Sequence, residues 1–181
     1  ARRRCPHSRH DYLMYAEGYF PDTYRIGGMK MHPMTLGHVL LIERVAPPFA
    51  PWRATEERIG SGSIMLFVAI VTRAWRDAAA VLERPSWVWQ WKAARITRRV
   101  NGDPRAVATV EAYLKAQVNI PEAIRWQRDD MAPTGAEMSH ALMVTMMQLG
   151  ATREAALDTP LRLALWDQMF LQEQNGAVSL E

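Results

Sequence analysis

Apolar side chains recur with helical periodicity along most of this 181-residue chain. The clearest case lies between Ser63 and Pro85, where apolar residues fall three or four positions apart, as on one face of an α-helix. The members of this face are Ile64, Phe67, Val68, Val71, Trp75, Ala78 and Leu82. The pattern predicts one helix over residues 63–84, central to the core of a mainly α-helical protein.

Helix start and stop signals divide the rest of the chain into similar segments. Thr134-Gly135-Ala136-Glu137 has the pattern of a capping box, and Asp103-Pro104 places proline at a first helical position. Stops are supplied by Pro47-Pro48, Pro85, Asn101-Gly102, Pro121, Gly150 and Gly176. N-caps are predicted at Thr35, Ser63, Ser86, Asp103, Thr134 and Thr159. The predicted fold class is therefore mainly all-α, a helical bundle of about six helices.

The N-terminal part of the chain has a different character. Residues 1–24 are polar and aromatic without sustained periodicity, which is typical of an extended arm. Gly27-Gly28, within Tyr24 to Met31, can adopt the positive φ angles of a two-residue turn. We expect a short β-hairpin there, with a turn that lacks a true sheet as the alternative. The predicted organisation is an arm over 1–24 and a single helical domain over 25–181, with a proline- and glycine-rich loop or linker at about 47–62.

The cysteine content and the apolar stretches bear on where the protein functions. Cys5 is the one cysteine and cannot form an internal disulfide, which favours a reducing compartment. No signal-peptide pattern follows the basic N-terminus, because residues 5–11 are polar. The apolar stretch Ile64–Val71 is too short to span a bilayer. We therefore expect a cytoplasmic protein without a membrane span. The final Leu180-Glu181 matches a common cloning remnant.

No motif in the sequence indicates catalysis. The patterns G-x-S-x-G and H-E-x-x-H and the phosphate-binding P-loop are absent from it. Glu137-x-x-His140 would place a carboxylate and an imidazole on one helix face, but a di-iron bundle needs that motif twice. We therefore predict a protein that is not an enzyme, without catalytic residues, cofactor or metal. A metal site at Cys5, His7 and His10, which would need a fourth ligand, stays open.

A segment over residues 87–99 interleaves three tryptophans with four cations. Its members are Trp87, Trp89, Trp91, Lys92, Arg95, Arg98 and Arg99. Aromatic rings beside cations are the chemistry of single-stranded nucleic-acid binding. The simpler interpretation is that Trp87 and Trp91, at i and i+4, face the core while the cations form a solvated face. Trp89 is then the exposed ring, and an exposed tryptophan often marks a protein interface.

Methionines gather on the segment that follows Thr134. Met143 and Met147 lie there with Met138 and Met146, and methionine suits adaptable binding grooves. Core packing is the simpler interpretation. Met143 and Met147, together with Trp89, are the candidate contacts for a protein partner.

Charge is distributed unevenly along the chain. Residues 1–100 carry 16 Lys and Arg against 8 Asp and Glu, a net charge of +8, whereas residues 101–181 carry 6 against 11, a net charge of −5. Such an asymmetry can steer an acidic partner toward the first half, or let copies of the chain associate head to tail. The simpler interpretation is a basic N-terminal tail with solvated helix faces.

Two segments resemble phage proteins. Arg25-Ile26-Gly27-Gly28-Met29-Lys30-Met31-His32-Pro33-Met34-Thr35-Leu36-Gly37 is similar to the opening of bacteriophage tail assembly chaperones and related small phage morphogenesis proteins, in which a short hairpin precedes a proline and a Thr- or Ser-led helix. Gly150 to Leu161, continued to Glu173-Gln174-Asn175-Gly176, is similar to the C-terminal helix pair of phage and prophage proteins. The resemblance covers roughly a quarter of the chain. It implies a non-enzymatic helical protein that binds tape-measure or tail subunits, without catalytic residues.

Three hypotheses for the function result. The first is a phage or prophage morphogenesis protein, cytoplasmic in the host or associated with the virion, that binds structural subunits through helix-in-groove contacts and associates with itself. The second is a basic helical protein that binds nucleic acid through Arg2–Arg4 and the Lys92–Arg99 face. The third is a helical enzyme whose site is assembled from dispersed residues such as Glu137, His140 and Asp167.

Overall fold

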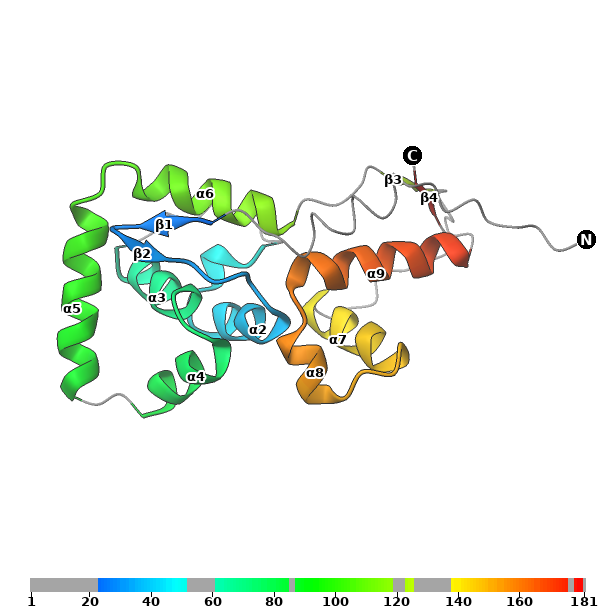
Figure 1. Cartoon of the computed structure of the whole chain (residues 1–181), viewed down its shortest axis with the longest axis horizontal. Coiled ribbons are helices and arrows are strands. Elements are labelled where there is room, and N and C mark those ends of the chain that lie inside the picture. The colour runs from blue at the N-terminus through cyan, green and yellow to red at the C-terminus, as the bar shows by residue number, and fades with distance from the viewer. Residues whose placement is uncertain are drawn as a thin grey trace, which may run out of the picture.

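The computed structural model is mainly α-helical, as the sequence predicts (Figure 1). It describes residues 23–51, 61–84, 87–118, 123–125, 138–175 and 178–180. Within these ranges the helices are α2 (Leu36–Val45), η1 (Pro47–Phe49, a 3₁₀ helix), α3 (Ser61–Val71), α4 (Trp75–Glu83), α5 (Trp87–Asn101), α6 (Ala106–Gln117), α7 (Met138–Gln148), α8 (Arg153–Asp158) and α9 (Leu161–Gln174). The strands are β1 (Arg25–Ile26), β2 (Met29–Lys30), β3 (Ala123–Arg125) and β4 (Val178–Leu180).

The predicted β-hairpin is present. β1 pairs antiparallel with β2, and the two residues between them, Gly27 and Gly28, have φ angles of +53° and +77°. Residues with a Cβ rarely adopt such angles. The hairpin is fixed to the rest of the molecule because Ile26 is fully buried and the Gly27 N–H donates to Asp103 Oδ2 at 2.9 Å. It therefore packs as part of the bundle, under α6 in Figure 1.

Helix α2 is the element around which most of the other helices pack. It contacts α3 and α4 as well as α7, α8 and α9. Thr35 is its N-cap, as predicted, and the Thr35 Oγ1 accepts from the His38 N–H at 3.5 Å. Leu36, Val39 and Ile42 form its fully buried face, in the spacing of a helix that is apolar on one side. A single buried cluster thus extends from the hairpin through α2 to α9.

The helix predicted over residues 63–84 is in fact two helices. α3 already includes Ser61, so Ser63 lies inside its first turn and is not its cap. α3 ends at Val71, and α4 begins after Ala74, whose φ of −63° and ψ of 144° are those of extended backbone. The prediction of one helix was wrong because the apolar periodicity continues across the break.

The break between α3 and α4 is stabilised from outside both helices. The His32 N–H donates to the Val71 carbonyl at 2.6 Å, and His38 Nε2 donates to the Arg73 carbonyl at 2.8 Å. The last carbonyls of a helix have no partner within the helix, so donors from elsewhere fix where it ends. One donor, His32, comes from the segment that joins the hairpin to α2, and the other, His38, comes from the first turn of α2. The position of the break therefore depends on tertiary contacts, and no local signal in the sequence predicts it.

Two of the predicted N-caps precede the residue that is the N-cap in the structure. Asp103 precedes α6 by three residues, and its Oδ1 accepts from the Arg105 N–H at 3.0 Å, in a turn before the helix. Thr159 ends α8, and Pro160 is the N-cap of α9. Each signal therefore marks a boundary between segments, with the helix beginning one or more residues later than predicted.

The predicted stop at Gly150 is confirmed. Gly150 has a φ of +94°, and its N–H donates to the Met147 carbonyl at 3.0 Å. The Ala151 N–H donates to the Met146 carbonyl, also at 3.0 Å. This pair of bonds is the Schellman motif, which satisfies the last carbonyls of a helix when a left-handed residue follows it.

The sequence pattern does not predict the second two-stranded sheet. β3 pairs antiparallel with β4, and Ala123 lies opposite Leu180. The strands are short and distant in sequence, so periodicity carries no signal for them. Other predictions lie outside the described residues: most of the arm predicted over 1–24, most of the linker at 47–62, the caps at Ser86 and Thr134, the stops at Pro85, Pro121 and Gly176, and Glu181. Among the described helices, none has both the length and the apolar character needed to cross a membrane.

Candidate functional site

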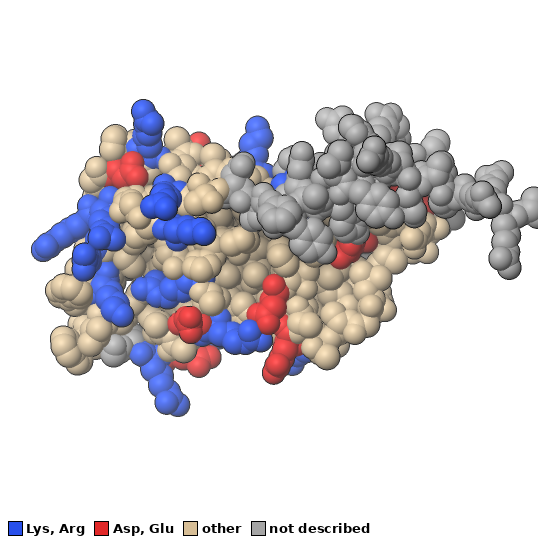
Figure 2. All heavy atoms as spheres, in the orientation of Figure 1, with Lys and Arg blue, Asp and Glu red and all other residues tan. Residues whose placement is uncertain are grey.

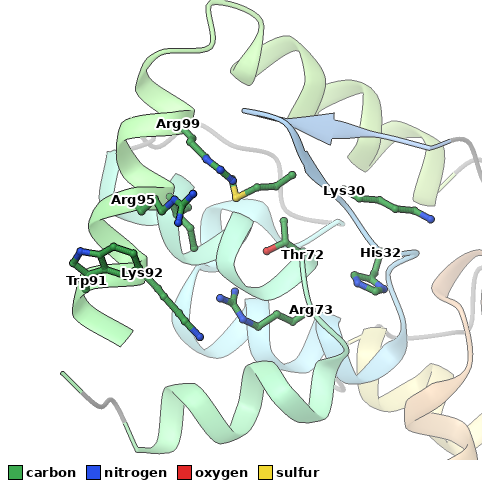
Figure 3. A pocket seen from close by; sticks show the side chains of 10 residues that line it. Lys30, His32, Thr72, Arg73, Trp91, Lys92, Arg95 and Arg99 are labelled. Carbon is green, nitrogen blue, oxygen red and sulfur yellow. The ribbon is translucent and has the colours of Figure 1, made fainter. Parts of the chain in front are cut away.

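An open pocket of about 550 Å³ lies between α5, the hairpin segment and the turn that joins α3 to α4 (Figure 3). Five cationic side chains and one imidazole line it, and none of the described residues that line it carries a carboxylate. These six residues are Lys30, His32, Arg73, Lys92, Arg95 and Arg99. We call this feature the basic pocket.

Helix α5 supplies one wall of the basic pocket. Lys92, Arg95 and Arg99 follow one another at intervals of three and four residues, so they share a face of the helix. Ile96 and Val100 are buried and hold α5 against the bundle. Three of the four cations predicted as a basic face thus line one pocket. Arg98, the fourth, is exposed and does not line it.

The segment from β2 to α2 supplies the facing wall, with Lys30 and His32 (Figure 3). Its backbone is fixed at several points. The Tyr113 hydroxyl donates to the His32 carbonyl at 2.7 Å, and the Met34 N–H donates to Gln117 Oε1 at 3.0 Å. Tyr113 and Gln117 both belong to α6 and are buried, and burial raises the pKa of Tyr113. The facing wall is therefore anchored to α6.

Arg73 comes from the turn between α3 and α4 and is held in place by two contacts. Its Nη1 donates to the Ala69 carbonyl at 2.7 Å, and its guanidinium carbon lies 5.2 Å from the centroid of the Trp89 ring. Partial burial lowers the pKa of Arg73, and the nearby Asp77 carboxylate opposes that shift. An arginine stays protonated in proteins all the same. Arg73 thus presents a fixed positive charge between the two walls.

The charges of the basic pocket are of one sign. Within the described residues, no carboxylate oxygen comes within 4.0 Å of the side-chain nitrogens of Lys30, Lys92 or Arg99 in an ion pair. Figure 2 shows the Lys and Arg side chains gathered over the end of the molecule that α5 and the hairpin form. Like charges around a concave surface reinforce one another and raise the local concentration of anions. The pocket is therefore built to attract an anion.

The structure reverses the predicted orientation of the tryptophans on α5. Trp87 is 80% exposed and Trp91 is 61% exposed, whereas Trp89 packs against the core. The prediction that Trp89 is exposed and the other two are buried was wrong. The reason is the position of α5 at the edge of the bundle, where its inner face is defined by Ile96 and Val100, seven and eleven residues after Trp89. Trp89 shares that inner face.

Helix α7, which is rich in methionine, carries two of the candidate contact residues, Met143 and Met147, and these differ in their exposure. Met143 is buried in the core, so it is not accessible to a partner, and the prediction of a contact there was wrong. Its position three residues before Met146 and one after Leu142 places it on the packed face of α7. Met147 is 48% exposed, and Val144, three residues before it, is 54% exposed. The exposed apolar side chains of α7 are therefore Met138, Val144 and Met147, of which Val144 and Met147 are one turn apart.

The residues considered for a metal site or for catalysis do not come together in the part of the chain that the structure describes. Groups of three or more His, Cys, Asp or Glu side chains able to hold a metal are absent among the described residues. His140 is exposed on α7 and Asp167 lies on α9. Glu137, Cys5, His7, His10 and Arg2–Arg4 lie outside the described residues. The enzyme hypothesis stays a prediction.

Three of the six basic residues that line the pocket were not predicted from the sequence. Lys30, His32 and Arg73 are isolated in the sequence, and each is distant from α5 along the chain. A cluster assembled from separate elements leaves no mark in any short window of sequence. The overall excess of positive charge in residues 1–100 was the available signal, and it did not say where the charges meet.

Comparison of the chain with protein-family models, with curated proteins and with solved structures finds no match.

Proposed function

We propose that this protein binds nucleic acid at the basic pocket. The observation that carries the proposal is the convergence of five cations from three separate parts of the chain on one open pocket, with no carboxylate among the lining residues that the structure describes. Neutralising phosphates with lysine and arginine releases counterions, and this release is the main source of affinity when proteins bind nucleic acids. An array of fixed cations is the surface that this chemistry requires.

The arrangement suits a polymer better than a small anion. Lys92 and Arg99 are seven residues apart on α5, which corresponds to about 10 Å along the helix axis. That length equals about three phosphate steps along one strand of B-DNA. Lys30 faces this row from the hairpin. A site for a small molecule usually encloses most of its ligand, whereas Lys30, Lys92, Arg95 and Arg99 are all exposed along an open pocket.

The test compares two double variants that remove the same charge. Arg95→Ala with Arg99→Ala takes two cations from the basic pocket, and Arg44→Ala with Arg153→Ala takes two exposed cations from α2 and α8. We expect the wild type to bind a fluorescein-labelled oligonucleotide with an affinity that falls steeply between about 50 and 200 mM salt. The pocket variant should bind on the order of tenfold more weakly, with the log–log salt slope shallower by about 0.7–0.9 per lost phosphate contact.

The control variant separates a specific pocket from general attraction by net charge. It has the same net charge as the pocket variant, so a diffuse electrostatic attraction would weaken equally in both. Equal losses would contradict the proposal, and so would a wild type that shows no binding at the lowest salt. Fluorescence anisotropy measures all of these affinities.

We propose protein assembly as the second candidate function, favoured by the exposed apolar pair Val144 and Met147 on α7. The resemblance of residues 25–37 to phage tail assembly chaperones names tape-measure or tail subunits as the partners, and self-association as the alternative. Exposed apolar side chains at helical spacing are typical of contacts between a helix and a groove. Phage morphogenesis thus stays a proposal that is independent of the basic pocket.

Met147→Glu is expected to abolish such an association. A charge placed at the centre of an apolar contact loses the burial energy and adds a desolvation cost, about 2 kcal/mol or more in total. Gln148→Glu is the matched control, because Gln148 is also exposed on α7 and receives the same charge. Light scattering over a range of protein concentrations, and co-purification with tail subunits, measure the result. A wild type that is monomeric throughout and retains no tail subunit contradicts the second candidate.

A further inference from the structure

Two exposed tryptophans lie on α5 beside the basic pocket. Trp87 is 80% exposed and Trp91 is 61% exposed, and Trp91 also lines the pocket. Burying a side chain of this size contributes more to stability than burying almost any other, so leaving two of them in water forgoes that contribution. The cations alone would attract a phosphate backbone without them. The rings therefore add a second kind of binding surface to the pocket.

The two rings have a regular geometry relative to the cations. Trp87 and Trp91 are four residues apart on one helix, so they lie on the same face, with about 5–6 Å between their Cβ atoms. Arg95 follows at the next turn, and its guanidinium carbon lies 5.7 Å from the centroid of the Trp91 ring. Figure 3 shows Trp91 at the outer side of α5, with Lys92 reaching toward Arg73. Two aromatic rings thus form a short row that leads up to the cations.

A row of exposed rings next to cations distinguishes between forms of nucleic acid. In a duplex the bases stack on one another, and the backbone presents phosphates alone to a basic surface. In a single strand each base has a free face, and proteins bind it by stacking aromatic side chains on the bases while cations follow the phosphates. Both kinds of side chain, aromatic rings and cations, are present here on α5 and in the basic pocket beside it.

We infer that the ligand of the basic pocket is a single-stranded nucleic acid, with successive bases stacked on Trp87 and Trp91 and the phosphates that follow held by Lys92, Arg95 and the facing Lys30. The inference rests on the proposed function and specifies its ligand. An acidic peptide would satisfy the cations, but it supplies no planar group for either ring. Two aromatic rings one turn apart fit a chain that carries a planar group on every unit.

The test compares labelled oligothymidylate with a duplex of the same number of phosphates. The wild type is expected to bind the single strand more tightly than the duplex. The double variant Trp87→Leu with Trp91→Leu keeps every cation and an apolar surface but removes both rings. It should lose on the order of tenfold or more in affinity for oligothymidylate, with little change in duplex affinity and an unchanged salt slope.

The control is Val107→Ala, which trims an apolar side chain that is 55% exposed on α6 and does not line the pocket. It should bind both ligands as the wild type does. Equal binding of duplex and single strand, unaffected by loss of the tryptophans, overturns the inference and leaves the proposed function in place. Failure of both nucleic acids to bind overturns the proposed function, and the inference with it. Competition by polyglutamate that is stronger than competition by unlabelled oligothymidylate also overturns the inference.

Discussion

Replacing Gly27 by alanine is expected to lower the free energy of unfolding by about 2–5 kcal/mol, the sum of two separate costs. The φ of Gly27 is +53°, which disfavours any residue with a Cβ. A Cβ at this position would also lie 2.8 Å from both the Cβ and the carbonyl oxygen of Arg99 on α5. Backbone of a packed helix cannot move aside as a flexible side chain does. The hairpin and α5 would therefore have to separate.

Gly28→Ala is the matched control for this prediction. Gly28 has a φ of +77°, but an added Cβ would meet no atom within 4 Å. The free energy of unfolding of this variant should thus fall by the conformational cost alone, about 1–2 kcal/mol. Denaturant unfolding of the two variants measures the difference between them, which is the cost of the contact with α5. Equal destabilisation of the two variants would show that a Cβ added at Gly27 makes no unfavourable contact with α5.

The expected separation has a consequence for binding, because the hairpin carries Lys30 and α5 carries Arg99 at opposite walls of the basic pocket. Gly27→Ala should weaken binding of oligothymidylate more than Gly28→Ala does. The geometry of the pocket thus depends on a glycine that contacts no ligand.

The fold could be predicted where the signal is local. The Gly27-Gly28 turn, the cap at Thr35 and the stop at Gly150 are each determined by a few adjacent residues, and the structure confirms them. The α3–α4 break could not be predicted, since it depends on donors from His32 and His38, more than thirty residues earlier in the chain. The pairing of β3 with β4 depends on an even longer separation in sequence.

The candidate site was predictable to the same extent. The row of cations on α5 could be read from the sequence, because it lies within two turns of one helix. The orientation of α5 could not, and it decides which tryptophans are exposed. Both faces of that helix carry large apolar residues, so the sequence allows either to pack inward. Contacts with α3 settle the choice by burying Ile96 and Val100.

His38→Ala is expected to lower the free energy of unfolding by about 2–4 kcal/mol. The His38 ring is buried and joins two helix ends. Its Nδ1 accepts from the Thr35 N–H at 3.1 Å, which completes a capping box at the start of α2. Because a backbone N–H can only donate, Nδ1 carries no proton, and Nε2 is the nitrogen that donates to the Arg73 carbonyl at 2.8 Å. Alanine would leave both backbone groups without these partners.

The same geometry makes the stability depend on pH. Burial lowers the pKa of His38 below its ordinary value of 6.5, as does the nearby His32, while the bond to the Arg73 carbonyl opposes the shift. Below pH 6.5 the unfolded chain therefore binds a proton at His38 that the folded protein does not. The contribution to stability is fully present above that pH and is lost as the pH falls from 6.5 toward the lower folded pKa. Denaturant unfolding at about pH 7.5 and about pH 5.5 measures this loss.

His38→Gln separates the capping role from the titration. Glutamine is a normal third residue of a capping box and can reach back to the Thr35 N–H, but it does not titrate. We expect this variant to fall between the wild type and His38→Ala in stability at the higher pH, and to lose the part of the pH dependence that His38 contributes. A loss of stability between the two pH values that equals that of the wild type would assign the pH dependence to another group. Protonation adds a hydrogen at Nδ1, so it removes the acceptor of the Thr35 N–H at the start of α2, whereas the Nε2 donor to the Arg73 carbonyl is kept.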